Sequence, residues 1–510
     1  MALNTRRSGV LLHPTSLPSP WGIGDLGSRA YEFVDFLNET HQQLWQLLPL
    51  GPTGENGSPY SAFSSIAGNP LLISLERLEE DGILSGVPTP EIPEPSRVDF
   101  QCVSAVKLHA LQVAFEQFQS QAQHHEGFQA FCVEQGEWID DYSLFMTLKA
   151  AFPGRKWNEW PKELTKREPW AIETASRDHE QLVAFHKFTQ YVFYQQWRKL
   201  KRYAHRSGIT IVGDIPFYVA FDSADVWANP ENFALDRETG EAMFMAGVPP
   251  DYFSETGQLW GNPIYDWRHL EANGFQWWVR RFQKLVELVD IVRIDHFRGF
   301  QAYWQVPRGE TTAVNGQWVE CCGDRFSHTL EHELGHLPVW AEDLGLITPE
   351  VEKLRDNFHF PGMEVLQFAF DEQLAENPYL PFNFPRNCVC YTGTHDNNTS
   401  LGWWNALDSD QRRQVLQLVD CTDERDIPWS LIRLAMSSIA NNVVIPLQDI
   451  LELSSDARMN VPGQEDGNWA WRYEPNSLTH STRDRLLQLT EIYGRSPRRI
   501  GPNRESALLL

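Results

Sequence analysis

The stretch IVRIDHFRG, residues 291–299, decides the fold class of this chain. It begins as an apolar, β-branched run and ends abruptly in an acid, Asp295, followed by a polar turn with glycine. A run of this kind is typical of a strand covered on both faces, because such a strand loses the alternation of apolar and polar residues. The stretch therefore predicts one buried strand of a parallel α/β sheet, with an acid at its carboxyl end.

Seven further runs of this kind lie along the chain. They are 9–13, 44–50, 210–214, 339–342, 365–368, 388–392 and 443–447. Helical patterns lie between several of them, including 275–289, where apolar and aromatic residues recur every three or four positions, and 350–357, which follows a Thr-Pro start. Eight strands alternating with helices predict an α/β fold of the (β/α)8 TIM barrel type.

The predicted strands are unevenly spaced. Long intervals follow the second and the third runs, and both exceed an ordinary barrel crossover. The first interval contains amphipathic segments at 105–119 and 182–202, which predict helices, and the second is rich in Trp, Asn, Pro and Gly and is interpreted as loop. We therefore expect a barrel with inserted, mainly helical subdomains and a long active-site loop. The expected divisions are a barrel start at 1–54, a helical insertion at 55–206, the rest of the barrel at 207–475 with an inserted loop at 215–270, and a C-terminal helix and tail at 476–510.

The composition argues against several classes of protein. There are 43 Lys and Arg and 68 Asp and Glu, and the formal net charge of −25 at pH 7 argues against binding to nucleic acid or to anionic membrane surfaces. No apolar run is long enough for a transmembrane helix, and the apolar run 10–12 is too short for a signal peptide. The seven cysteines lack the spacing of a zinc ribbon or a disulfide framework. We expect a cytoplasmic protein with a neutral or small-molecule partner, as a monomer or weak homo-oligomer.

Acidic residues close four of the predicted strands. Asp214 ends the third strand, Asp295 the fourth and Glu342 the fifth, and Asp396 follows the seventh. In a (β/α)8 barrel the active site lies at the carboxyl ends of the strands, so these carboxylates are expected to converge on one mouth. A single Asp after a strand is more often a helix N-cap, which is the role we assign to Asp343 or Asp222 before any other acid. Several acids packed together raise each other's pKa and cost stability, so their coincidence favours a chemical function.

Clustered acids without cysteine ligands fit two kinds of chemistry. One is a divalent metal site, and the other is cleavage of a glycosidic bond by a pair of carboxylates. The sequence favours glycoside chemistry, because 20 Trp, 14 Tyr and 29 Phe supply aromatic faces for sugar rings and no Gly-rich phosphate loop is present nearby. In this interpretation Asp295 is the nucleophile. Arg293, two residues earlier on the same face of the strand, keeps Asp295 ionised.

Longer motifs around these residues resemble a known family, the 4-α-glucanotransferases or amylomaltases of glycoside hydrolase family 77, in the α-amylase superfamily. The motifs are RIDHFRG at 293–299, AEDLG at 341–345, TGTHDN at 392–397, GDIPFYV at 213–219, DSADVWANP at 222–230, WGNPIYDW at 260–267, PGM at 361–363, RMNVPG at 458–463 and NWAWR at 468–472. The resemblance covers nearly all of 8–473 and is loose only in the helical insertion. Two small departures, Asn398 and Phe217, touch none of the three main acids.

The resemblance implies a role for each strand-end acid. Asp295 would be the nucleophile, Glu342 the general acid and base, and Asp396 the third acid, which binds ring hydroxyls and favours a distorted sugar. Arg293 and His395 would flank the cleaved ring. The remaining expected substrate contacts are Asp214, Ser58 and Tyr60 on the donor side, Trp260 and Asp251 on a loop that closes over the acceptor side, Phe368 at the end of the sixth strand, and Asn460.

The implied reaction is a retaining double displacement on α-1,4-glucans such as maltooligosaccharides, without a cofactor or metal. A sugar hydroxyl rather than water would intercept the glucosyl-enzyme. We interpret 247–262 as a lid that holds the acceptor and keeps the intermediate dry, with a surface Ω-loop as the alternative. The main alternative function is an α-1,4-glucan hydrolase of the α-amylase type. A glucan-binding protein and a metallohydrolase are further rivals.

Two short motifs outside the strand ends invite other interpretations. HELGH at 332–336 matches a zinc-protease pattern, but Gly335 weakens the helix and the segment precedes a strand, on the side of the barrel away from the expected mouth. We interpret it as a surface helix. Cys388 and Cys390 share one face of a strand, where small buried thiols are ordinary. We expect no redox role for them.

Overall fold

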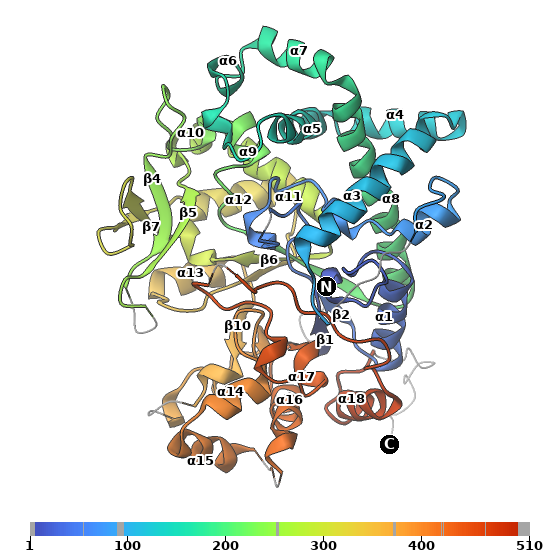
Figure 1. Ribbon diagram of the computed structural model, residues 1–510. Helices are drawn as coiled ribbons and strands as arrows, with labels where there is room; N and C mark the ends of the chain where they lie inside the picture. Colours follow the sequence, from blue (N-terminus) through green and yellow to red (C-terminus); the bar gives the residue numbers. More distant parts are fainter. Residues whose placement is uncertain are drawn as a thin grey trace, which may run out of the picture.

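An eight-stranded parallel sheet forms the centre of the molecule (Figure 1). The computed structural model describes residues 6–54, 56–88, 96–250, 254–370, 374–419, 421, 423–464 and 466–497. The strands of this sheet are β1 (Arg7–Leu11), β2 (Leu44–Gln46), β3 (Thr210–Pro216), β6 (Ile291–Asp295), β9 (Val339–Ala341), β10 (Gly362–Val365), β11 (Cys388–Tyr391) and β12 (Asn442–Pro446).

The sheet curls until its two edge strands meet. Its order is β10-β11-β12-β1-β2-β3-β6-β9, and neighbouring strands are parallel. The N–H of Ala341, at the end of β9, donates to the carbonyl of Pro361, next to β10, at 2.9 Å. The predicted (β/α)8 TIM barrel is thus confirmed, and the carboxyl ends of all eight strands meet at one mouth.

Helices cover the outside of the barrel. They include α1 (Ser28–Glu39), α8 (Glu180–Arg206), α11 (Gln276–Leu288), α12 (Gly323–Leu334), α13 (Pro349–Asn357), α16 (Ile427–Ser437) and α18 (His480–Ile492). Apolar side chains recur at helical spacing on the buried faces, as in α11, where Trp277, Trp278 and Phe282 lie in the core. Because the helices cover one face of each strand and barrel side chains the other, the strands read as short apolar runs. All five residues of β12 are buried.

The long interval between β2 and β3 is helical. It contains α2 (Leu75–Glu80), α3 (Phe100–Gln119), α4 (His125–Glu134), α5 (Gly136–Ala151), α6 (Lys162–Thr165), α7 (Pro169–Asp178) and the long helix α8. In Figure 1 most of these helices lie together in the upper part of the view. The opposite end of the view holds α14 (Ser400–Ala406), α15 (Ser409–Leu418) and α16, near α17 (Leu447–Ile450). Two short helices, α9 (Ala224–Ala228) and α10 (Trp267–Ala272), lie between β3 and α11 in the sequence.

The expectation of a loop after the third barrel strand was wrong in part. The structure has two strands there, β4 (Phe244–Val248) and β5 (Gln258–Pro263), which join β7 (Ala302–Pro307) and β8 (Gln317–Glu320) in an antiparallel sheet of order β5-β4-β7-β8. We call this the lid sheet. The lid sheet was not recognisable in the sequence because β4 needs a glycine where its backbone lies close to that of β5. A Cβ on Gly247 would come within 2.2 Å of the Gln258 carbonyl oxygen. Glycine in a strand weakens the alternation that reveals one.

The sixth barrel strand was predicted a few residues too late. Strand β10 ends at Val365, and Leu366–Phe368 form a 3-10 turn. Phe368 therefore does not end a strand as expected, and its ring packs on Tyr379 with centroids 5.4 Å apart. The error came from Glu364, a half-buried acid within β10 that interrupts the apolar run.

Most of the aromatic surplus belongs to the core. Trp45, Trp157, Trp197, Trp278 and Trp404 are among the largest fully buried side chains. Trp278 and Trp404, each from a pair of adjacent tryptophans, pack in the interior. In the part of the chain that the structure describes, no helix combines the length and apolarity needed to cross a membrane.

Candidate active site

Arg293 lies at the centre of the strand-end acids. In β6, Arg293 and Asp295 are two residues apart, so their side chains share one face of the strand. Arg293 Nη1 lies 2.6 Å from Asp214 Oδ2 and 3.1 Å from Asp295 Oδ1. Asp214 comes from β3, where it pairs in register with Arg293. One buried guanidinium therefore joins acids from two neighbouring strands, as the sequence predicted for Asp295.

The acids of this cluster outnumber its cation. Burial raises the pKa of Asp295 well above its ordinary value, Arg293 acts in the opposite direction, and Asp214 and Glu342 add to the rise. Burial lowers the pKa of Arg293, but Asp214 and Asp295 outweigh it, so Arg293 stays charged. Because Arg293 is in direct contact with Asp295, its guanidinium favours the ionised form of Asp295 and opposes the effect of burial.

Glu342 follows β9 directly, one strand along from Asp295. Its Oε2 accepts the His296 N–H at 2.6 Å and its Oε1 accepts the Leu344 N–H at 2.9 Å. Burial raises the pKa of Glu342, and Arg293 and the two N–H groups oppose the rise without cancelling it. A carboxyl group that is both fixed in place and inclined to keep a proton is suited to general acid catalysis.

Asp396 is held by a segment distant in sequence. Asn460 Nδ2 donates to Asp396 Oδ1 at 2.6 Å, and Arg458 Nη2 donates to the Asp396 carbonyl at 2.5 Å. His395 Nε2 lies 3.4 Å from the other carboxylate oxygen. The Asp396 side chain is nevertheless 45% exposed, so it is oriented by its neighbours and still open to a ligand.

Aromatic rings form one side of the cluster. Tyr60 donates its hydroxyl to Asp214 Oδ2 at 2.8 Å and stacks on His395 with centroids 5.1 Å apart and planes at 10°. Trp469 lies against both rings, at 5.6 and 5.9 Å. Burial lowers the pKa of His395, so this imidazole is neutral near pH 7. The Tyr60 ring is thus packed on His395 across one face and also contacts Trp469.

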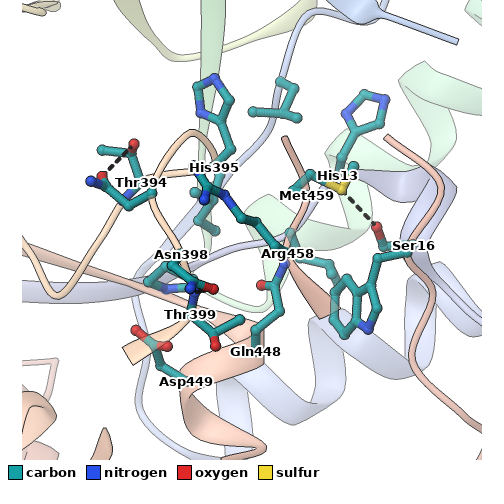
Figure 2. Close-up of a pocket in the computed structure, with 16 residues that line it drawn as sticks. His13, Ser16, Thr394, His395, Asn398, Thr399, Gln448, Asp449, Arg458 and Met459 are labelled. Atoms are coloured by element: carbon teal, nitrogen blue, oxygen red, sulfur yellow. Dashed lines mark hydrogen bonds between the residues drawn. The ribbon is translucent and has the colours of Figure 1, made fainter. Parts of the chain in front are cut away.

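Two hollows lie beside this network. One adjoins His395 and is lined from the ends of β1 and β12, from the segment after β11 and from the segment around Arg458 (Figure 2). The other is lined by Tyr60 and Asp214 among others. Asp214 is the one acid of the cluster among the described residues that line these two hollows. Among the described residues no group of three or more His, Cys, Asp or Glu could hold a metal ion.

A sequence model of the family described as 4-alpha-glucanotransferase matches residues 12–479. The chain belongs to this family. It is 52% identical to the 4-alpha-glucanotransferase of Synechocystis over 97% of this chain and 99% of that one, and 49% identical to that of Thermus thermophilus over 95% and 98%. Among solved structures, amylomaltase from Streptococcus agalactiae in complex with acarbose has a TM-score of 0.94 at 37% identity, covering 96% of this chain and 100% of that chain. The predicted family resemblance is confirmed.

The structure of this 4-alpha-glucanotransferase brings most of the predicted site residues together. Asp214, Asp295, Arg293, Tyr60 and His395 form one connected network, with Asp396 and Asn460 attached through His395, and Glu342 follows the strand next to that of Asp295. Ser58 is buried in the turn before Tyr60, where its N–H donates to Asn56.

Three other predicted contacts lie away from this network or outside the described residues. Trp260 is on β5, 38% exposed, with its ring edge-on to His296 at 4.9 Å. Phe368 packs on Tyr379 and makes no recorded contact with the acids among the described residues. Asp251 lies outside the part of the chain that the structure describes.

Sequence reasoning overlooked His296. Its backbone is left-handed, with φ of 55°, which is uncommon for a residue other than glycine and concentrates at functional sites. This turn aims the His296 N–H at Glu342 and places the ring beside Trp260. Burial, with help from Arg298, lowers the His296 pKa to about 3, so the ring is neutral. Its position directly after Asp295 was the available signal.

The HELGH segment does not present two histidines one helical turn apart on a helix. Helix α12 ends at Leu334, and Gly335 follows with φ of 76°. His332 is exposed and pairs with the adjacent Glu333 at 3.0 Å. Cys388 and Cys390 are buried in β11, and all seven cysteines are free thiols.

Proposed function

We propose that this enzyme, a 4-α-glucanotransferase, works by a retaining double displacement in which Asp295 is the nucleophile, Glu342 the general acid and base, and Asp396 the acid that binds ring hydroxyls. The observation that carries the proposal is the contact between Arg293 and Asp295 at 3.1 Å, because this guanidinium opposes the burial that raises the pKa of Asp295 and so favours the anionic nucleophile. Burial also raises the pKa of the neighbouring Glu342, which favours the protonated form that a general acid needs. Two carboxyl groups with opposed protonation are what retaining glycoside chemistry requires.

In the first step, an Asp295 oxygen attacks the anomeric carbon of an α-1,4-linked glucosyl residue. The glycosidic bond breaks as the Glu342 proton passes to the leaving oxygen, and the covalent glucosyl-enzyme forms. In the second step, ionised Glu342 removes a proton from the 4-hydroxyl of an acceptor glucan or glucose. That oxygen displaces Asp295, and the α-configuration is restored.

The remaining residues would orient the sugars. Asp396 is open to solvent and fixed by Asn460, which suits it to hold two hydroxyls of the cleaved ring as the ring flattens. Neutral His395 can hydrogen-bond the same ring. We place Arg293, Asp214, Tyr60 and Ser58 on the donor side and Trp260 with Asp251 on the acceptor side, and the role of Phe368 as a sugar contact stays a prediction.

Transfer rather than hydrolysis needs an acceptor held close to the intermediate and water kept away. The lid sheet supports this: Trp260 stands 38% exposed beside His296, whose N–H holds Glu342. An exposed aromatic face next to the general base suits an acceptor sugar. The α-amylase type of hydrolase, which would not need such a platform, is not favoured.

Incubation of the pure enzyme with maltotriose tests the function. We expect glucose together with chains longer than maltotriose, and no steady rise in reducing ends. Reducing ends that rise without longer products would identify a hydrolase, and the absence of any product would leave only a binding protein.

The partners we propose are maltooligosaccharides and longer α-glucans, which carry no charge and impose no requirement on the acidic surface. A cytoplasmic location is supported by the seven free thiols, of which Cys388 and Cys390 are buried in a barrel strand. A monomer or weak homo-oligomer remains our expectation for the oligomeric state.

A further inference from the structure

Arg298 is a buried cation for which the described residues supply no acidic partner. The residue lies in the 3-10 turn η7 (Phe297–Phe300), just after Asp295, and is 7% exposed. Its Nε is buried without a hydrogen-bond partner in the described part of the chain. Burying an unpaired guanidinium is costly, so a native structure that keeps one generally uses it.

The guanidinium of Arg298 joins two segments. It lies 3.8 Å from the centroid of the Trp318 ring, and Nη1 donates to the carbonyl of Leu346. Trp318 belongs to β8 of the lid sheet and contacts Trp304 of β7, with centroids 5.2 Å apart. The flat guanidinium is suited to stacking on an indole and donating in its own plane at once, which lysine cannot do.

Arg298 belongs to one of the two segments that hold Glu342, and its hydrogen bond to Leu346 ties it to the other. The His296 N–H, two residues before Arg298, binds Oε2, and the Leu344 N–H, two residues before Leu346, binds Oε1. Between Leu344 and Leu346 lies Gly345, with φ of 84°, where the chain is easily bent. Before Leu344 the chain is anchored at Asp343, which accepts hydrogen bonds from the Met363 N–H at 2.8 Å and from Arg355 Nη1 at 2.6 Å. Arg298 supplies the anchor after Leu344, through the Leu346 carbonyl.

We propose that Arg298 is a positioning residue for Glu342, and that its stack on Trp318 couples the orientation of this carboxyl group to the lid sheet. The inference rests on the proposed role of Glu342 as general acid. It explains why an unpaired cation is kept beside the acids, and it gives the lid sheet a mechanical link to the bond-breaking step in addition to its place beside the acceptor.

The inference predicts a specific change in pH dependence. Loss of Arg298 weakens the N–H bonds that favour ionised Glu342, so its pKa rises further and the basic limb of the kcat/KM profile moves to higher pH. The charged and titratable groups that face Glu342 are Arg293 and Asp295 from β6, Asp343 beside it in the chain, and Tyr379. None of these is changed by the substitution.

The test compares Arg298→Met with wild type on two donors. Maltotriose needs its leaving oxygen protonated, whereas the fluoride of α-maltosyl fluoride departs with little help from an acid. We expect kcat on maltotriose to fall about 10- to 100-fold with KM little changed, single-turnover release of fluoride to stay within about threefold, and Arg298→Lys to recover part of the loss.

The matched control is Arg412→Met. Arg412 also stacks on a tryptophan, Trp404, at 5.2 Å and also donates to backbone carbonyls, but it lies on α15, in the lower part of Figure 1. We expect both donors to react at wild-type rates in this variant. If Arg298→Met does not fold, Trp318→Leu at the 38% exposed ring should give the same donor pattern with a loss of about 3- to 10-fold on maltotriose.

Equal losses on both donors, or no loss on either, would overturn the positioning role of Arg298. Glu342→Gln separates this result from a failure of the proposed function. If Glu342→Gln keeps full activity on maltotriose, the acid role of Glu342 is itself wrong. If Glu342→Gln spares only the fluoride donor while Arg298→Met does not discriminate, the acid role stands and the positioning role fails.

Discussion

The barrel mouth and the lid sheet are built in different ways. At the barrel mouth, Arg293 is 3% exposed and held between acids of two parallel strands, each covered by helices. The lid sheet has four short antiparallel strands, of which two expose a tryptophan, Trp260 and Trp318, at 38% each. The bond-breaking groups therefore stand on buried barrel strands that helices cover, and the groups that would meet the acceptor stand on a smaller sheet with exposed tryptophans.

This difference separates two properties of the reaction. Substitutions at the barrel mouth should remove cleavage and transfer together, because both steps use the same carboxyl groups. Substitutions in the lid sheet should leave cleavage largely intact and change which nucleophile, sugar or water, completes the reaction. The contact of Arg298 with Trp318 is the proposed exception, since it connects the two regions.

The largest effect is expected from Asp295→Asn. The amide cannot attack the anomeric carbon, so we expect transfer and hydrolysis of maltotriose to fall together by about 10⁴-fold or more. The control is Asp222→Asn, which removes a partly buried acid that pairs with Lys149 at 2.6 Å outside this cluster. That variant should keep wild-type turnover. Turnover retained by Asp295→Asn would refute the nucleophile assignment.

The next effect is expected from Arg293→Met. Removing the cation takes away the group that opposes the rise in the Asp295 pKa, so this pKa goes up further. A nucleophile must be ionised, and activity is lost as pH falls through its pKa; the acidic limb of the kcat profile should therefore move to higher pH. We also expect kcat to fall about 10²- to 10³-fold at the optimum. An acidic limb that stays in place would show that Arg293 does not control the ionisation of Asp295.

The barrel mouth could be predicted from sequence because its information is local. Arg293 and Asp295 are two residues apart on a recognisable strand, and the strand alone places both side chains on one face. Asp214 lies near the end of β3 and Glu342 directly follows β9, and these two strands flank β6, so the barrel topology alone brings both acids to the same mouth. The family resemblance added the roles of these acids.

The lid sheet could not be predicted, because its strands are short and are paired across segments that lie apart in the sequence. Its strands are four to six residues long, come from both sides of β6, and pair through a register shift between Met245 and Gly247. The turn at His296 and the contact of Arg298 with Leu346 depend on where two loops meet, which no local pattern encodes. The prediction placed Phe368 at the end of a strand because the half-buried acid Glu364 interrupts the apolar run of β10 and hides the true position of this strand.

The smallest effect, and the most direct comparison of the two regions, is expected from Trp260→Ala. If this ring is the acceptor platform, its loss costs about 1.4 kcal/mol of acceptor binding, and the ratio of transfer to hydrolysis should fall about 10-fold. Single-turnover release of fluoride from α-maltosyl fluoride should change little, since the barrel mouth is intact.

The control for Trp260→Ala is Trp170→Ala, which removes a 61% exposed tryptophan from α7 of the helical insertion. Both variants lose an exposed indole, so a shared change would reflect surface chemistry rather than position. A lower ratio in Trp260→Ala alone would place acceptor binding on the lid sheet. An unchanged ratio of transfer to hydrolysis would mean that the barrel mouth itself excludes water. The proposal that cleavage depends on the barrel mouth and acceptor binding on the lid sheet would then be wrong.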